Sequence, residues 1–195
     1  MAKLYFRYGA MNSGKSTLLL QTCYNYQENN MKAIIVKRSI DTKGSNTITS
    51  RIGVSKEVDL LLNDDDNIYE IVKKKYRKVN CVLVDEAQFL SKEQVDECMK
   101  IVIDLDIPVI CYGLRTDFLT NGFEGSTRLL QIAHTIEEMK TICKCGRKAI
   151  YNARYKDGKM ITKGSQVAID GEKNVTYVSM CAKCYEKEKN KIDKK

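Results

Sequence analysis

The chain has 195 residues, of which 43% are hydrophobic and 30% are charged, and its formal net charge is +8. This length allows one buried core with a small appendage and excludes two full nucleotide-binding lobes, while the apolar content excludes an intrinsically disordered chain. No apolar run approaches the roughly 20 residues of a membrane span, and the N-terminus has no signal-peptide core. We therefore expect a cytoplasmic protein without a membrane partner.

The positive charge is concentrated toward the C-terminus, where residues 140–195 hold 15 Lys and Arg against 6 Asp and Glu. Such asymmetry is found in nucleic-acid-binding proteins, but it is also typical of a solvated chain end. We favour the second interpretation and expect residues 188–195 to form a basic, disordered tail with no nucleic-acid partner.

Apolar periodicity predicts strands that alternate with helices along the first 140 residues. The predicted strands are 4–8, 33–36, 81–84 and 108–112, and the predicted helices are 15–26, 68–78 and 92–105. Residues 116–125 are predicted to form a functional loop or lid. The alternation predicts an α/β domain over residues 1–140, with a parallel sheet and helices on both faces.

The segment from Gly9 to Ser16 matches the G-x-x-x-x-G-K-S pattern of a P-loop, after a predicted strand and at the start of a predicted helix. Glycines let the backbone wrap a triphosphate closely, and amide N–H groups at the helix N-terminus attract its charge. Lys15 would reach the β- and γ-phosphates, and the Ser16 hydroxyl would bind Mg²⁺. The sequence therefore predicts a site for ATP with Mg²⁺.

Two carboxylates, Asp85 and Glu86, follow the apolar run 81–84, which is typical of a central parallel strand. An acidic pair at a strand end can be an ordinary solvated turn. With a P-loop present, both fall at the sheet edge where ligands bind, so we interpret Asp85 as a magnesium ligand and Glu86 as the base that accepts a hydroxyl proton. The single histidine, His134, lies far from these motifs.

Eight cysteines divide into two groups. Cys23, Cys81, Cys98 and Cys111 stand alone in apolar segments and are predicted to be buried core residues. The pairs C-x-C and C-x-x-C near the C-terminus predict a structural zinc site of four thiolates rather than unrelated buried thiols. Its ligands would be Cys143, Cys145, Cys181 and Cys184.

Taken together, these motifs resemble the type II thymidine kinase family, from the first strand to the second cysteine pair. The landmarks are Gly9 to Thr17, Asp41-Thr42-Lys43, Ser50-Arg51-Ile52-Gly53, Asp85 to Phe89, Tyr112-Gly113-Leu114, Phe118, Phe123, and Tyr177 four residues before Cys181. The resemblance implies a RecA-like P-loop domain and a zinc-bound, β-rich lasso over residues 141–187 that closes the nucleoside site.

The family's site residues transfer to matching positions in this chain. ATP would contact Gly9, Met11, Asn12, Ser13, Gly14, Lys15, Ser16, Thr17, Asp85 and Gln88, with its phosphates on Gly14, Lys15, Ser16 and Thr17. Mg²⁺ would be held by Ser16, Asp85 and Asp41. The nucleoside would contact Met11, Phe89, Leu114, Phe118, Phe123, Ile169, Gly171 and Tyr177.

The resemblance also implies an activity and an assembly. The activity is phosphorylation of the 5′-hydroxyl of thymidine and of deoxyuridine by ATP, with Glu86 and Lys15 as catalytic residues, in a homotetramer. We expect loss of the lasso to weaken nucleoside binding more than ATP binding. Asn152 departs from the family pattern, because animal members have a threonine there, near the thymine methyl group.

Two other classes of protein remain open. Asp85-Glu86-Ala87-Gln88 superficially resembles a helicase motif, so a nucleic-acid-dependent ATPase with a zinc ribbon is the alternative, although helicase action needs a second motor lobe. The other class is a zinc-ribbon binding module that ATP merely regulates.

Overall fold

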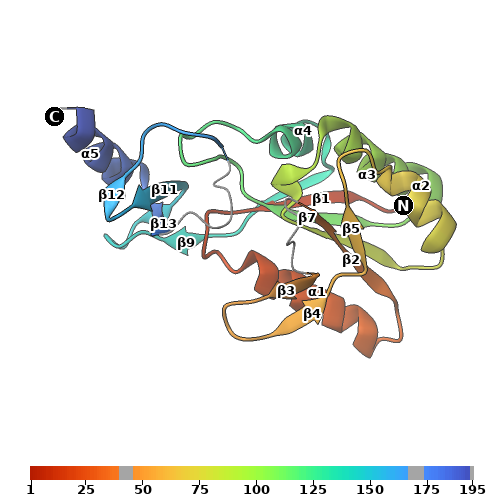
Figure 1. The fold of residues 1–195 in the computed structure, drawn as a ribbon. Helices are drawn as coiled ribbons and strands as arrows, with labels where there is room; N and C mark the ends of the chain where they lie inside the picture. Colours follow the sequence, from red (N-terminus) through yellow and green to blue (C-terminus); the bar gives the residue numbers. More distant parts are fainter. Residues whose placement is uncertain (40–45, 167–173, 194–195) are drawn as a thin grey trace.

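The computed structural model describes residues 1–39, 46–166 and 174–193, and its centre is a parallel sheet (Figure 1). Among the described residues, six strands form this sheet in the order β5-β2-β6-β7-β1-β8, and every paired neighbour runs parallel. The strands are β1 (Leu4–Tyr8), β2 (Ala33–Arg38), β5 (Leu60–Leu62), β6 (Cys81–Asp85), β7 (Val109–Gly113) and β8 (Thr135–Glu138). The predicted α/β class is confirmed.

Alternating side chains of the central strands feed two separate cores. In β6, Val82 and Val84 join the larger core, whereas Cys81 and Leu83 face the smaller one. Helices α2 (Ile68–Lys75), α3 (Lys92–Leu105) and α4 (Glu124–Ile132) lie on one side of the sheet, and α1 (Lys15–Glu28) lies on the other (Figure 1). Strands covered on both faces must be apolar at successive positions, which explains the runs that predict them.

Several elements differ from the sequence prediction. Helix α4 begins at Glu124, inside the predicted loop, and edge strand β8 follows it. Strands β3 (Thr47–Thr49) and β4 (Ser55–Glu57) pair as a short hairpin beside α1. These elements escape prediction because they are too short, or too polar, to show a clear period. None of the helices in the described part of the chain combines the length and apolar character that a membrane crossing requires.

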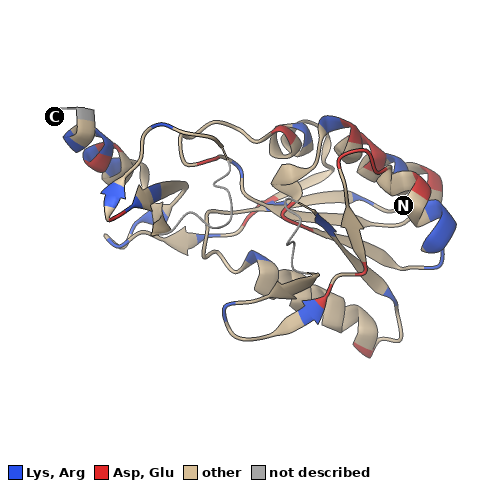
Figure 2. Ribbon diagram, viewed as in Figure 1, with Lys and Arg blue, Asp and Glu red and all other residues tan. Residues whose placement is uncertain are grey.

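The C-terminal module, defined as residues 141–193 without 167–173, has its own small core. It contains β9 (Thr141–Ile142), β10 (Lys148–Ala149), β11 (Tyr151–Lys156), β12 (Lys159–Met160), β13 (Val175–Met180) and α5 (Ala182–Asp193). Strand β11 pairs antiparallel with β12 and with β13, and β9 pairs with β10. Lys and Arg residues recur across this module (Figure 2).

The predicted disordered tail is wrong for residues 188–193, which continue helix α5. Tyr185 and Ile192, two helical turns apart, both pack on the small core of the C-terminal module. Glu188 and Lys191 also pair across one turn. A weak apolar face and one surface pair thus extend the helix into a segment whose composition suggests only a solvated chain end.

Candidate functional site

A cavity of about 400 Å³ opens where the P-loop meets the carboxyl ends of the central strands. Its walls are Met11, Asn12, Gly14, Lys15, Ser16, Thr17, Thr49, Arg51, Ile52, Glu86 and Leu114. The sequence predicts all of these as site residues except Thr49, Arg51 and Ile52. The structure thus gathers, in one cavity, groups from the P-loop, the end of β6 and the end of β7.

The P-loop connects β1 to α1 and packs too closely for any side chain at its first position. A Cβ atom on Gly9 would lie 2.4 Å from the Met139 carbonyl oxygen and 2.5 Å from the Ser13 hydroxyl. The Lys15 ammonium turns back into the loop and donates to the carbonyl oxygens of Gly9 at 3.2 Å and Ala10 at 3.0 Å. Lys15 therefore lies where phosphate oxygens could replace these backbone partners.

Charge at this end of the sheet is shared by one lysine and two carboxylates. Burial lowers the pKa of the Lys15 ammonium, and the Glu86 and Asp85 carboxylates oppose that effect. Burial and, to a smaller extent, the neighbouring Glu86 carboxylate raise the pKa of Asp85 to about 7. Asp85 is only 5% exposed, so its ionised form needs a cation nearby.

Gln88 fixes the position of the Glu86 side chain and of the backbone directly after β7. Its side-chain amide donates to the Glu86 carboxylate, and its amide oxygen accepts the backbone N–H of Leu114 at 3.0 Å. The Leu114 carbonyl in turn accepts the Ser126 hydroxyl from α4. Gln88 is 2% exposed. It is thus a buried positioning residue, whereas the sequence suggests only a contact with ATP.

The predicted nucleoside residues lie in different surroundings. Leu114 and Met11 line the cavity, while Phe89 and Phe123 pack edge to face with ring centroids 5.6 Å apart. Phe118 is 2% exposed and is covered by a guanidinium. Ile169 and Gly171, like the predicted magnesium ligand Asp41, lie outside the described residues.

Arg154 organises the surroundings of Phe118 and Tyr177 although no sequence motif marks it. Its guanidinium lies 3.8 Å from the Phe118 ring centroid and donates to the Tyr177 hydroxyl at 2.8 Å. It also donates to the carbonyl oxygens of Ser165 and Gln166, both at 2.9 Å. Arg154 is only 5% exposed, and because this burial follows from the fold, the sequence offers no signal that could have revealed it.

The remaining residues missed by sequence reasoning come from the end of β3 and from the hairpin turn after it. Thr49, Arg51 and Ile52 reach the cavity because Ser50 closes the turn, with its hydroxyl accepting the Val54 N–H. Arg51 and Ile52 belong to a landmark of the resemblance, so the signal was present without an assigned role. His134, in contrast, lies at the opposite end of β1, where its Nδ1 atom accepts the Leu4 N–H.

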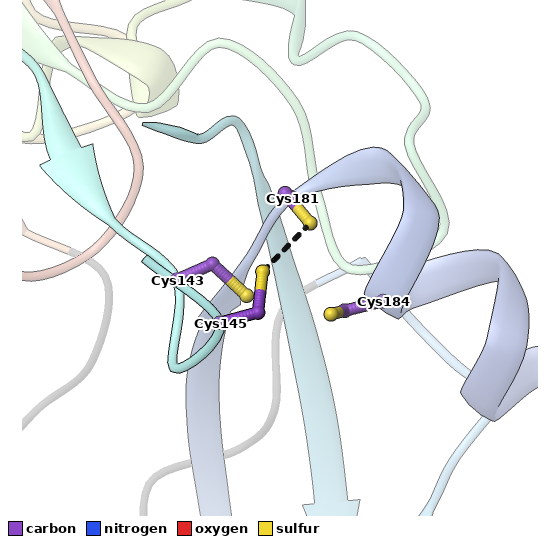
Figure 3. Close-up of side chains that lie close together, drawn as sticks. All are labelled: Cys143, Cys145, Cys181 and Cys184. Atoms are coloured by element: carbon purple, nitrogen blue, oxygen red, sulfur yellow. Dashed lines mark hydrogen bonds between the residues drawn. The ribbon is translucent and has the colours of Figure 1, made fainter. Parts of the chain in front are cut away.

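Four cysteine side chains converge on one point in the C-terminal module (Figure 3). Their sulfur atoms all lie within 4.8 Å of one another, and those of Cys145 and Cys181 are 3.6 Å apart. Four Zn–S bonds of about 2.3 Å in a tetrahedron give sulfur separations of about 3.8 Å. The cluster therefore fits a structural zinc ion, and the C-x-C pair contributes both of its thiols to it.

Local backbone geometry prepares Cys143 and Cys145 to bind metal, whereas side-chain hydrogen bonds from Cys145 and Cys181 raise the pKa of the Cys184 thiol. Cys143 and Cys145 lie on the hairpin between β9 and β10, which the Gly146 N–H closes on the Cys143 carbonyl at 2.8 Å. Hydrogen bonding from the Arg147 backbone lowers the pKa of the Cys145 thiol to about 6. Backbone hydrogen bonds from Cys145 and Cys181 lower the pKa of Cys143 as well. Thiolate is the form that ligates zinc. The four lone cysteines, as predicted, are buried.

The parallel sheet, the P-loop cavity and the adjacent carboxylate pair define a P-loop nucleotide-binding protein of the phosphotransferase class. The thymidine kinase family model matches residues 2–185. The thymidine kinase of Haemophilus influenzae is 48% identical over 98% of this chain and 100% of its own length. That of Rhodopirellula baltica is 50% identical over 93% of this chain and 86% of its own.

The chain belongs to the thymidine kinase family. The resemblance inferred from the sequence is therefore confirmed. Among solved structures, the replication initiator DnaA bound to AMPPCP and single-stranded DNA superposes with a TM-score of 0.44 and 16% identity. That superposition covers 72% of this chain and 41% of DnaA and is too slight to support an argument.

Proposed function

We propose that this protein transfers the γ-phosphoryl group of ATP to the 5′-hydroxyl of thymidine, and also of deoxyuridine. The observation that carries the proposal is the shared cavity: the P-loop lysine, Lys15, and the carboxylate of Glu86 line the same space. Family membership supports thymidine as the acceptor. The cavity volume of about 400 Å³ suits a small ligand.

The reaction needs few groups because phosphoryl transfer depends mainly on positioning and charge neutralisation. The 5′-hydroxyl oxygen forms a bond to the γ-phosphorus while the bond from that phosphorus to the β–γ bridging oxygen breaks. Glu86 accepts the hydroxyl proton, and ADP leaves with the bridging electron pair. Lys15 exchanges its backbone partners for phosphate oxygens and neutralises the charge that they carry.

A magnesium ion fits the donor set at the end of β6. Ser16 lines the cavity, and Asp85 is a buried carboxylate whose pKa is raised by burial and by Glu86, so a further cation would stabilise its ionised form. Together with Asp41, these oxygen donors would hold Mg²⁺. When bound, the ion supplies charge neutralisation for the phosphates. ATP itself would lie along Gly9, Met11, Asn12, Ser13, Gly14, Ser16 and Thr17.

For the nucleoside, we propose a pocket in which Met11 and Leu114 contact the base and Phe89, Phe118, Phe123 and Tyr177 supply the aromatic surroundings, with Ile169 and Gly171 as further contacts. Flat aromatic and apolar surfaces suit a pyrimidine. The proposal also includes a catalytic domain at residues 1–140, a zinc-bound lasso at 141–187, a homotetramer and a cytoplasmic location, as the family resemblance implies.

The decisive experiment measures 5′-monophosphate formation from a panel of radiolabelled nucleosides with Mg-ATP. The Glu86→Gln variant should lose about 10²–10⁴ in turnover while it keeps its ATP affinity. Glu28→Gln, at an exposed glutamate near the end of α1, is the matched control and should match the wild type. Unaltered turnover in Glu86→Gln would exclude Glu86 as the base and favour a binding module that ATP regulates. ATP hydrolysis stimulated by single-stranded DNA and not by thymidine would favour the ATPase alternative.

A further inference from the structure

Three side chains of the C-terminal module hydrogen-bond to the P-loop backbone at Met11 and Asn12. The Asn152 side-chain oxygen accepts the Met11 N–H at 2.7 Å, and the Ser179 hydroxyl donates to the Met11 carbonyl. The Thr141 hydroxyl donates to the Asn12 carbonyl at 3.3 Å. Both backbone groups of Met11 are thus bound by residues more than 100 positions away in the sequence.

The two residues that grip Met11 form one structural unit. Asn152 and Ser179 lie directly opposite each other on β11 and β13. They are 4% and 7% exposed, so water does not compete freely for their hydrogen bonds. Ser179 lies two residues before the zinc ligand Cys181. The metal cluster therefore closes the same end of the sheet that reaches the P-loop.

The gripped segment includes a residue with a left-handed backbone, and Lys15 and the turn at Ser13 also bond this loop from within. Asn12 has a φ of 66°, in the left-handed region that non-glycine residues seldom adopt. Asparagine adopts this conformation more readily than most side chains, and the contacts around it help to fix it. An empty loop released from Asn152 and Ser179 can relax away from this shape, and binding phosphate then requires the loop to be ordered again.

We infer that Asn152 and Ser179 are positioning residues that preorganise the P-loop for the phosphates of ATP. The C-terminal module then has a second role besides closing the nucleoside site. Its sheet, which ends at the cysteine cluster, also holds the P-loop that binds the phosphates. The inference rests on the proposed function for the identity of the nucleotide. It contradicts the sequence-based expectation that this module matters mainly for the nucleoside.

The test compares Asn152→Ala and Ser179→Ala with Thr176→Ala, which changes an exposed residue of β13 and is the matched control. Affinity for Mg-ATP is measured by titration calorimetry without nucleoside, and zinc content is measured on each sample. We call Asn152 and Ser179 the clamp. Each of the two alanine variants of the clamp should bind Mg-ATP about five- to tenfold more weakly at full zinc content, as expected for loss of one buried hydrogen bond. The control should bind as the wild type does.

The double variant should lose less than the product of the two single losses, because both side chains hold the same residue. Ser179→Thr keeps the hydroxyl and should restore affinity, which a general loss of stability would not explain. Removal of zinc with a chelator should weaken Mg-ATP binding of the wild type. In the metal-free protein, the substitutions at Asn152 and Ser179 should then cause little further loss of Mg-ATP affinity.

Wild-type affinity in both alanine variants at full zinc content would overturn the inference, as would unchanged ATP affinity after zinc removal. Failure of the proposed function is a separate result. A protein that binds Mg-ATP through this clamp but does not phosphorylate thymidine would refute the activity and leave the clamp standing.

Discussion

Replacing Asp85 by asparagine should stabilise the ligand-free protein above neutral pH. Asp85 ends the buried strand β6, and burial raises its pKa from 3.8 to about 7. A raised pKa means that the folded protein keeps a proton that the unfolded chain has already lost. The stability associated with that proton is fully present below the unfolded pKa and is lost as pH rises through the folded one.

The size of the effect follows from the shift. Between about pH 4 and pH 7, the wild type should lose about 1.4 kcal/mol of unfolding free energy per pH unit from this group, and little more above pH 7. Asparagine does not titrate and avoids the loss. Relative to the wild type, Asp85→Asn should therefore gain roughly 2–3 kcal/mol between pH 5 and pH 8.

The assay is urea unfolding of zinc-loaded, magnesium-free protein at a series of pH values. Thr176→Ala is the control, since Thr176 is an exposed residue of β13 that does not titrate. It should show no growing advantage at higher pH. A stability difference between Asp85→Asn and the wild type that stays constant from pH 5 to pH 8 would refute the reasoning. The variant should also lose phosphoryl transfer, because the proposed metal ligand is gone.

Other substitutions test the side chains that position the site. Arg154→Lys keeps the charge but loses the planar fork that holds Tyr177, so the KM for thymidine should rise about tenfold with little change for ATP. Gln88→Met keeps the volume but releases Glu86, so kcat should fall about 10–100-fold while ATP affinity stays. Gly125→Ala places a Cβ atom 2.5 Å from the Ala87 carbonyl oxygen and should cost about 1–3 kcal/mol in urea unfolding.

Each of these has a contradicting result. Arg147→Lys, at an exposed arginine of the C-terminal module, is the control for Arg154. Equal rises in the KM values for thymidine and ATP would show that Arg154→Lys acts through general unfolding. Unchanged kcat in Gln88→Met would remove Gln88 from the positioning of the base. Wild-type stability in Gly125→Ala would mean that α4 can move away from the 3-10 turn of residues 87–89.

Local signals suffice for the parts of this protein whose structure is locally determined. The central strands are apolar at successive positions because both faces are covered, and α3 starts at Ser91 with a capping box that includes Gln94. The P-loop and the four cysteines are motifs, and the spacing of residues in each motif is set by the single ligand that this motif binds. The sequence therefore predicts the parallel sheet, most of the cavity wall and the thiol cluster.

Contacts between distant segments were not predictable in the same way. Asn152 and Met11 are 141 positions apart, and neither residue type predicts the hydrogen bond that joins them. Arg154 looks like one more charge in a basic segment until the fold buries it on Phe118. Helix α5 continues past residue 188 because Ile192 reaches a core that composition alone does not reveal.

The two loops that form the site share one physical arrangement. Asn12 in the P-loop and Glu86 after β6 both have left-handed backbones, with φ values of 66° and 50°. Each costs about 1–2 kcal/mol relative to an ordinary conformation. A buried side chain bonds beside each of them: Asn152 accepts the N–H of Met11, next to Asn12, and Gln88 donates to the Glu86 carboxylate. Because these left-handed residues flank the reacting groups, the geometry of the site depends on the buried side chains of Asn152 and Gln88 as well as on the P-loop itself.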